Sequence, residues 1–475
     1  MASPQTPLVV DLDGTLIHTD LLVESALTAC KDNLGTLFAV PGWLGRGKAE
    51  LKRELAARAE LDIATLPWNL PLLEWLRAER AGGRTLVLAT ASDLRYAQQV
   101  QAHLGCFDEV FASCDGRNLA AAHKRAALVE RFGEGGYDYA GNAHDDLEVW
   151  RSARQAVVVN APSGLQAQIG IPVAKVFARP AGPARAWGRA LRLHQWLKNA
   201  LLFLPLLAAH RFDAASWLAG ALGFLAFSLC ASSVYLLNDL LDLTADRHHP
   251  RKRLRPFAAG RLPALHGALL APLLLLAALG IAFTLSRPFG AVLIAYYGLT
   301  LAYSFYLKRI AMLDVMTLAG LYTIRIVAGA ALTTIVPSFW LLSFALFFFL
   351  CLAFLKRYTE LVGLHTAKGG DSKGRGYAAI DAPIVAAQGA AAGYTSVLVL
   401  AFYINSAEVT VLYREPRWLW GICVLLLYWL NRSWWLAHRG RLHDDPVIYA
   451  VMDGGSRLIL LAVLALLAIA SLHLW

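Results

Sequence analysis

The chain has 475 residues, 57% of them hydrophobic, and a net charge of +10. This composition is too apolar for a water-soluble protein, and the charge is uneven: residues 1–178 carry a net −4 and residues 179–475 a net +14. The basic residues of the second part are interleaved with apolar runs of about 20 residues, enough to cross a bilayer, so they mark membrane-flanking loops rather than a nucleic-acid surface.

Residues 1–178 alternate strand-like and helix-like segments, which predicts an α/β domain with a Rossmann-like parallel sheet. Ligands are then expected at the carboxyl ends of the strands. A mostly helical insertion at 18–84 is predicted to form a small cap. The expected strands and one clear helix lie at 8–10, 85–89, 137–140 and 156–159, and at 121–132.

An acidic motif directly follows the first predicted strand, in the order Asp11, Leu12, Asp13, Gly14, Thr15. Two carboxylates at i and i+2 on an extended tip point the same way, so one of Asp11 and Asp13 can attack phosphorus while the other protonates the leaving oxygen. Gly14 allows a sharp turn around a phosphate. The motif therefore predicts a catalytic pair.

Residues 1–178 resemble the haloacid dehalogenase (HAD) superfamily of phosphatases, because three further motifs follow the first in the family's order. The resemblance implies that Thr90 and Lys124 bind the phosphoryl group. It also implies a Mg²⁺ site made by Asp11, Asp13 and the acids of 141–146 (GNAHDD), for which we assign Asp145 and Asp146.

One position departs from the HAD pattern. Asn142 stands where the family usually has the first acid of motif four, and a hard cation prefers charged oxygen ligands. We therefore expect phosphatase activity with weakened metal binding. The alternative is a catalytically weak regulatory or binding module.

Residues 179–197 are predicted to form a linker and an amphipathic entry helix, and residues 198–475 an all-α membrane domain. We expect nine membrane-spanning helices. Most basic residues then fall on the cytosolic side if the N-terminus is cytosolic, which predicts a bacterial inner-membrane protein with both active sites in the cytosol. The expected spans centre near residues 205, 226, 274, 298, 322, 346, 398, 425 and 466.

A second acidic motif closes the second predicted span. Helical spacing places Asn238, Asp242 and Asp246 on one face, with Asp239 beside them. Four oxygen-bearing side chains at a membrane boundary are costly unless they bind something, and Mg²⁺ on a diphosphate is the natural occupant. A basic cluster at 247–255 follows at once and fits the same chemistry.

The N-D-x-x-D-x-x-x-D spacing resembles the first aspartate-rich motif of UbiA prenyltransferases. The second D-x-x-x-D of those enzymes was not found. Other segments instead resemble the decaprenyl-phosphate phosphoribosyltransferase branch, in which phosphoribosyl diphosphate carries the diphosphate and a lipid phosphate is the nucleophile. These segments are 194–199 (HQWLKN), 255–260 (RPFAAG), 303–308 (YSFYLK) with Asp314, 356–361 (KRYTEL) and 443–446 (HDDP).

The resemblance implies Mg²⁺ at Asn238 and the three aspartates, with Asp239 and Asp242 also catalytic. It implies substrate-binding roles for a set of basic and aromatic side chains. That set is Lys198, Arg247, Arg253, Arg255, Tyr303, Lys308, Lys356 and Arg357. Arg325, inside the fifth predicted span, either faces this site or pairs with a structural carbonyl or acid.

The two halves together suggest one pathway. The membrane domain would transfer 5-phosphoribose from phosphoribosyl diphosphate to a polyprenyl phosphate, and the phosphatase would remove the 5-phosphate, both with Mg²⁺. The alternative is an aromatic prenyltransferase that joins a polyprenyl diphosphate to a hydroxybenzoate or quinone precursor. The sequence leaves the oligomeric state open.

Overall fold

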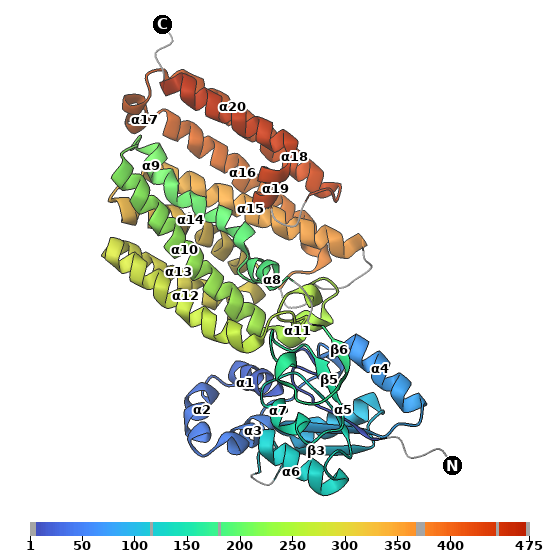
Figure 1. Cartoon of the computed structure of the whole chain (residues 1–475). Coiled ribbons are helices and arrows are strands. Elements are labelled where there is room, and N and C mark those ends of the chain that lie inside the picture. The colour runs from blue at the N-terminus through green and yellow to red at the C-terminus, as the bar shows by residue number, and fades with distance from the viewer. Residues whose placement is uncertain (1–5, 115–116, 179–181, 367–375, 443–445, 472–475) are drawn as a thin grey trace. The chain divides into compact units, whose positions relative to one another are not determined.

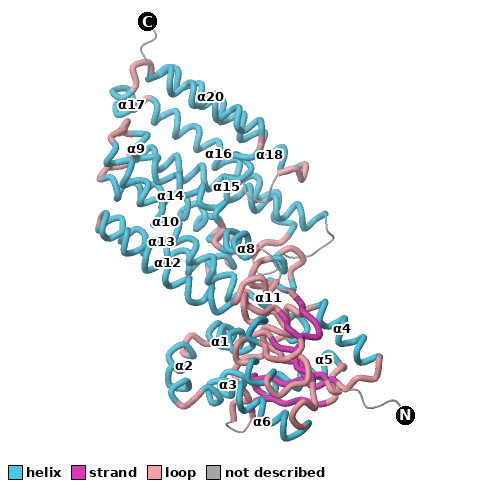
Figure 2. The backbone as a smooth tube through the Cα atoms, viewed as in Figure 1, coloured by secondary structure: helices cyan, strands magenta, loops and turns pink. Residues whose placement is uncertain are grey.

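The computed structural model describes residues 6–114, 117–178, 182–366, 376–442 and 446–471 (Figure 1). The chain divides into two compact units. The first consists of Met1–Arg192 and Tyr235–Pro272, and the second of Leu193–Val234 and Leu273–Trp475. The segment Tyr235–Pro272, which the sequence analysis assigned to the membrane domain, thus belongs to the first unit. All the strands of the described chain lie in the first unit, as Figure 2 shows in magenta.

The first unit contains a six-stranded parallel sheet in the order β3-β2-β1-β4-β5-β6. This confirms the predicted α/β class. The central strand reads Leu-Val-Val and is fully buried, as expected for a strand covered on both faces. The strands are β1 (Leu8–Val10), β2 (Leu86–Asp93), β3 (Glu109–Ser113), β4 (Asp138–Gly141), β5 (Ala156–Val159) and β6 (Val173–Phe177).

Helices cover both faces of the sheet because alternate strand residues enter two separate cores. Leu8 and Val10 pack with α4 (Leu70–Ala81) and α5 (Leu94–Leu104) on one face. On the other face Val9 packs with α6 (Ala121–Phe132) and α7 (Asp146–Trp150).

The predicted cap region contains a three-helix subdomain with a small core of its own, in which Trp43, Leu51 and Leu55 are buried. Because α4 packs on the sheet, this subdomain is smaller than the predicted segment 18–84. Its helices are α1 (Leu21–Asp32), α2 (Thr36–Gly45) and α3 (Lys48–Ala56). The other helices of the first unit are the short η1 (Ile63–Thr65), η2 (Gln166–Gln168), α8 (Pro183–Ala190), α11 (Leu243–His248) and η4 (Lys252–Leu254).

The second unit is helical, and its α15 packs against both α14 and α16. Helix α10 continues from the second unit into the first, and α12 leads back. The long helices are α10 (Ala214–Leu241), α12 (Ala264–Leu285), α13 (Arg287–Phe305), α14 (Leu313–Thr333), α15 (Phe339–Thr366), α16 (Ala382–Ile404), α18 (Trp420–His438) and α20 (Gly454–Ser471). The short ones are η3 (Leu193–Phe203), α9 (Leu204–Ala208), η5 (Leu307–Arg309), η6 (Ala379–Asp381), α17 (Ala407–Leu412), η7 (Pro416–Leu419) and α19 (Pro446–Met452).

Among the described residues, seven helices are long and apolar enough to cross a membrane, which fits a multi-pass membrane protein. They are α10, α12, α13, α14, α15, α16 and α20. The expected count of nine is therefore not confirmed. Near residue 205 the chain forms the short helices η3 and α9, and Pro205 supplies no backbone donor there. Near residue 425, α18 carries Asn431 and Arg432, which lower its hydropathy, and Arg432 pairs with Asp453 at 2.6 Å.

Candidate active sites

The first acidic pair follows β1, between β2 and β4, where the strand order reverses and α/β sheets bind ligands. Asp13 accepts hydrogen bonds at both carboxylate oxygens. Oδ1 accepts from the backbone N–H of Leu21 at 2.8 Å, and Oδ2 accepts from the hydroxyls of Ser92 at 2.7 Å and Thr90 at 3.3 Å. Hydroxyl groups from β2 thus converge on Asp13.

Asp11 is held by a buried lysine. Lys124 Nζ, on α6, donates to Asp11 Oδ1 at 2.7 Å and to the Tyr139 hydroxyl at 3.0 Å. Tyr139 in turn donates to Asp146 Oδ1 at 2.7 Å. Lys124, Asp11 and Asp146 are all more than 90% buried. The structure therefore brings together Asp11, Asp13, Thr90, Lys124 and Asp146.

The turn after Asp13 leaves no room for a side chain. Gly14 has φ +74°, and a Cβ built there would lie 2.1 Å from Asn142 Nδ2. Asp146 Oδ2 accepts from the backbone N–H groups of Asn142 and Ala143, whereas Asp145 is exposed. The amide of Asn142, rather than Asp145, is the motif-four group that lies against this turn.

This donor set fits a small divalent cation. Mg²⁺ takes oxygen ligands and usually keeps several waters, so few protein groups suffice. Asp11 and Asn142 offer side-chain oxygens on neighbouring loops. Nowhere in the described ranges do three or more His, Cys, Asp or Glu side chains gather around one potential metal position. Any cation here would therefore depend on the Asp11 carboxylate together with amide and water oxygens.

Burial shifts the pKa values of the acidic pair upward. Burial raises the pKa of Asp11 to about 6, with Lys124 opposing the shift and Asp146 adding to it. Burial, helped by Asp20 and Asp11, raises the pKa of Asp13 to about 7. Burial alone would lower the pKa of Lys124, but attraction to Asp11 and Asp146 raises it instead. Asp13 is thus able to hold a proton near neutral pH.

A small cavity lies beside Asp13 under the cap. Its lining includes Leu21 and Ser92, both bonded to Asp13, and Lys52 of α3. Lys52 Nζ donates to the Ala91 carbonyl at 2.5 Å and to Asn118 Oδ1 at 2.9 Å, and burial lowers its pKa. The cap therefore brings a basic side chain to the edge of the site around Asp13.

The aspartate-rich segment begins at the end of α10, within the first unit. Asp239 and Asp246 are almost fully buried and share one guanidinium: Arg255 Nη1 lies 3.1 Å from Asp239 and 2.7 Å from Asp246. Arg192 approaches Asp239 at 2.6 Å, and Lys252 lies 4.0 Å from Asp246. Burial raises the pKa of Asp246, although Arg255 opposes the shift. Buried acids and basic side chains therefore meet, as the motif predicted.

The helical face predicted for this motif is interrupted. Helix α10 ends at Leu241 and α11 begins at Leu243, so Asp242 lies at a break, where it is partly exposed and 3.4 Å from Lys31 Nζ. Arg253 is exposed. The guanidinium of Arg247 pairs with Glu24 within the unit. The substrate-binding role of Arg247 stays a prediction.

In the second unit, two predicted substrate-binding residues belong to a buried network around Asp314. Arg357 pairs with both carboxylate oxygens of Asp314 and with Glu360. Tyr303 donates to Asp314 Oδ1 at 2.9 Å. Asp314 and Arg357 are 0% and 1% exposed. Arg357 and Tyr303 are thus placed to hold α13, α14 and α15 together.

The predicted lysines of this unit are more accessible than Arg357. Lys198, Lys308 and Lys356 are each half-buried, and Lys198 Nζ lies 5.4 Å from the ring centre of Tyr322. Arg325 pairs with structural groups: Nε donates to Asn199 at 2.9 Å, and another nitrogen donates to the Leu321 carbonyl. The segment 443–446 lies outside the described residues except for Pro446.

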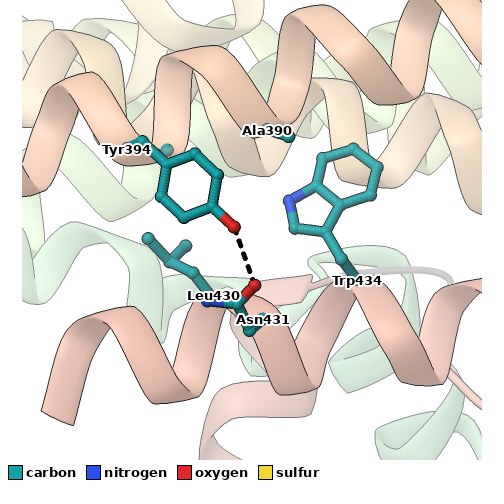
Figure 3. A pocket seen from close by; sticks show the side chains of 6 residues that line it. Ala390, Tyr394, Leu430, Asn431 and Trp434 are labelled. Carbon is teal, nitrogen blue, oxygen red and sulfur yellow. Dashed lines mark hydrogen bonds between the residues drawn. The ribbon is translucent and has the colours of Figure 1, made fainter. Parts of the chain in front are cut away.

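A second cavity lies between α16 and α18 and is shown in Figure 3. The Tyr394 hydroxyl donates to Asn431 Oδ1 at 2.8 Å beside the indole of Trp434. The residues that line it are Ala390, Gly393, Tyr394, Leu430, Asn431 and Trp434. Since none of them is charged, this cavity does not suit a diphosphate.

Sequence reasoning missed several of these groups. Ser92 lies two residues after Thr90 on an extended strand, so the period of two could have indicated it. Tyr139, Lys52 and Arg192 offered no such signal, because their partners are distant in the sequence.

Comparison with known proteins adds family information. The model of the UbiA prenyltransferase family matches residues 200–461. The chain is 38% identical to the protein y4nM of Sinorhizobium fredii over 453 residues, 94% of this chain and 87% of that one. It is 39% identical over 178 residues to a decaprenyl-phosphate phosphoribosyltransferase of Mycobacterium tuberculosis, 36% of this chain and 59% of that one. A HAD family hydrolase from Salmonella enterica superposes with a TM-score of 0.28 and 16% identity, over 36% of this chain and 68% of that one.

Proposed function

The chain belongs to the UbiA prenyltransferase family, and from this premise we propose that it is a bifunctional enzyme of a bacterial inner membrane. One reaction transfers 5-phosphoribose from phosphoribosyl diphosphate to a polyprenyl phosphate. The other removes the 5-phosphate and leaves polyprenyl-phosphoryl-ribose. The likeness to decaprenyl-phosphate phosphoribosyltransferase supports the first reaction. The observation that carries the second is the buried contact of Lys124 with Asp11, 2.7 Å long, beside the hydroxyl-bonded Asp13.

The phosphatase reaction uses the two acids in turn. Asp11 attacks the phosphorus of the 5-phosphate, the bond from phosphorus to the ribose oxygen breaks, and protonated Asp13 gives its proton to that oxygen. Asp13 then accepts a proton from water, which attacks the aspartyl phosphate and releases inorganic phosphate. Lys124, Thr90 and Ser92 hold the phosphoryl oxygens. The raised pKa of Asp13, about 7, supports its role as the acid.

The transfer reaction forms a bond from a lipid phosphate oxygen to the anomeric carbon of ribose. The bond from that carbon to the diphosphate breaks, and diphosphate leaves. Mg²⁺, bound at the acidic clusters, would neutralise the charge of the phosphoryl and diphosphate groups. In the aspartate-rich segment we assign this ligand role to Asn238, Asp239, Asp242 and Asp246.

Basic side chains bind the remaining phosphates in this proposal. Arg253 and Arg255 follow the aspartates directly and are assigned to the diphosphate. The half-buried Lys198, Lys308 and Lys356 are assigned to the sugar 5-phosphate and the lipid phosphate. The buried Arg357 and Tyr303 act on these groups indirectly, through the packing around Asp314.

The excess of basic residues in the loops of the membrane part supports a cytosolic location for both reactions. A phosphatase in the same chain would then meet the lipid product at a high local concentration.

A lipid product assay tests the proposal. Purified chain in detergent is incubated with Mg²⁺, decaprenyl phosphate and phosphoribosyl diphosphate, and the lipid fraction is analysed by mass spectrometry. Wild type is expected to give lipid-linked ribose, and Asp11→Asn to accumulate the 5-phosphorylated lipid. The matched control Asp32→Asn removes an exposed carboxylate and should behave as wild type.

The other outcomes are equally informative. If folded wild type adds no ribose to lipid but joins a polyprenyl diphosphate to a hydroxybenzoate, the aromatic prenyltransferase alternative replaces this proposal. If Asp11→Asn and wild type give the same mixture, the phosphatase assignment fails and the N-terminal domain, residues 1–178, is a regulatory or binding module.

A further inference from the structure

The aspartate-rich segment and the cap helix α1 belong to one compact unit, although more than 200 residues separate them in sequence. A buried ion pair joins them. Arg247 donates to Glu24 through Nη1 at 2.8 Å and Nη2 at 2.5 Å, and its Nε donates to the Ala258 carbonyl at 3.1 Å. The side chains of Arg247 and Glu24 are 5% and 4% exposed.

Further contacts surround this pair. His248 Nε2 lies 2.8 Å from Asp62, and Lys31 of α1 lies 3.4 Å from Asp242. The backbone approaches closely at Gly260, where an added Cβ would lie 2.4 Å from the Cβ of His18. The segment is therefore packed against α1 and its neighbours along much of its length.

The pair joins the aspartate-rich segment to the helix that begins beside Asp13. Arg247 directly follows Asp246, so the position of its guanidinium constrains the backbone that carries this carboxylate. Glu24 lies one helical turn beyond Leu21, whose N–H holds Asp13. A bidentate pair fixes both distance and orientation, and a buried charge that loses its partner is strongly destabilising.

We propose that α1 of the phosphatase-type domain positions the aspartate-rich segment for the transfer reaction, with Glu24 and Arg247 as positioning residues. The fusion is then required for transfer itself, and the N-terminal domain does more than raise the local concentration of a second activity. This inference rests on the proposed function.

The test compares Glu24→Gln and Arg247→Gln in the full chain. Removal of one partner should raise the KM for phosphoribosyl diphosphate about tenfold or more, with the KM for the lipid phosphate unchanged. Hydrolysis of p-nitrophenyl phosphate should stay within about twofold of wild type, because neither side chain touches Asp11, Asp13 or Lys124. Glu60→Gln removes an exposed cap carboxylate and is the matched control.

A second readout does not depend on transfer. Trypsin cuts after basic residues, and the run 251–255 (RKRLR) lies in the packed segment. Cleavage within this run should be faster in both variants than in wild type. Arg247→Lys keeps the charge without the bidentate geometry and should be intermediate. The double variant Glu24→Arg, Arg247→Glu exchanges the two charges. It should bring the KM for phosphoribosyl diphosphate and the resistance to trypsin part of the way back to the wild-type values.

The outcomes separate the two proposals. The positioning role is overturned if both single variants keep the wild-type KM for phosphoribosyl diphosphate and the wild-type rate of cleavage. It is also overturned if both variants lose kcat to the same extent with no change in this KM. No recovery in the exchanged pair also overturns it. If wild type shows no ribosyl transfer, the proposed function fails, while the cleavage rates still decide whether Glu24 and Arg247 hold the segment.

Discussion

Two pairs of aspartates in the first unit have different partners. Asp11 and Asp13 receive one lysine and three hydroxyl groups, with a small cavity beside them. Asp239 and Asp246 share the guanidinium of Arg255, which lies between them. Hydroxyls and an ammonium thus contact the first pair, whereas a single guanidinium nitrogen bridges the two carboxylates of the second pair.

The difference indicates two kinds of site. In the proposed function the first pair supplies the nucleophile and the acid of the phosphatase reaction. The second pair would bind a metal and a diphosphate, and Arg255 already lies between its carboxylates. Variants of one pair should therefore leave the other reaction intact.

The largest effect is expected for Asp11→Asn. Loss of the nucleophile should lower phosphatase activity by about 10³-fold or more, while ribosyl transfer stays near wild type. Release of inorganic phosphate from p-nitrophenyl phosphate measures the first activity, and label in the lipid measures the second. A parallel loss of both activities would contradict the separation of the two pairs.

The converse variant is Asp239→Asn. It removes a proposed metal ligand and leaves Arg192 and Arg255 without their shared acid, so transfer should fall about 10²-fold. Hydrolysis of p-nitrophenyl phosphate is the internal control and should not change. Retained transfer would exclude Asp239 from the reaction.

The raised pKa of Asp13 predicts a pH-dependent stability in the absence of divalent cations. Since the folded state holds this proton up to about pH 7 and the unfolded state only to its ordinary value of 3.8, stability should fall as pH rises between these values. The slope is at most about 1.4 kcal/mol per pH unit for this group, and stability levels off above pH 7.

Midpoints of thermal unfolding with EDTA, recorded for wild type and Asp13→Asn across this window, measure the slope. The variant should lose part of the pH dependence. Identical curves for the two proteins would show that Asp13 keeps an ordinary pKa.

The smallest effect distinguishes two neighbouring arginines. Arg255→Gln should lower transfer about tenfold, because it unpairs two buried acids. Arg253→Gln, at an exposed position where solvent screens its contact with the diphosphate, should lower transfer less, by about threefold. Initial rates at saturating lipid phosphate give the comparison, and a larger loss for Arg253→Gln would reverse the assigned roles.

The sequence predicted those features whose partners are near in the chain. The strand before Asp11, the hydroxyl of Thr90 and the acids of 238–246 all came from local patterns. Strand β6 was missed because it lies at the sheet edge with exposed residues at its centre, and so lacks a continuous apolar run. The nine expected spans included α18, which is not among the seven apolar helices of the structure. Its Arg432 forms an ion pair with Asp453, and hydropathy along the sequence does not reveal this pair.

Ion pairs between residues that are distant in the sequence could not be predicted. Arg247 lies in a basic cluster beside acids, which favours a phosphate-binding role, yet its partner Glu24 lies 223 residues away. Arg357 likewise pairs with Asp314 across two helices. Charge composition indicates that such residues need partners, and only the fold determines which partners they find.

The most direct test of the account uses phosphoribosyl diphosphate labelled with carbon-14 in the ribose and phosphorus-32 in the 5-phosphate. Wild type should give lipid that keeps the carbon label and loses the phosphorus label with time, and Asp11→Asn should give lipid that keeps both in equal proportion. A constant ratio of the two labels in wild-type lipid, or no carbon label in lipid at all, would contradict the account.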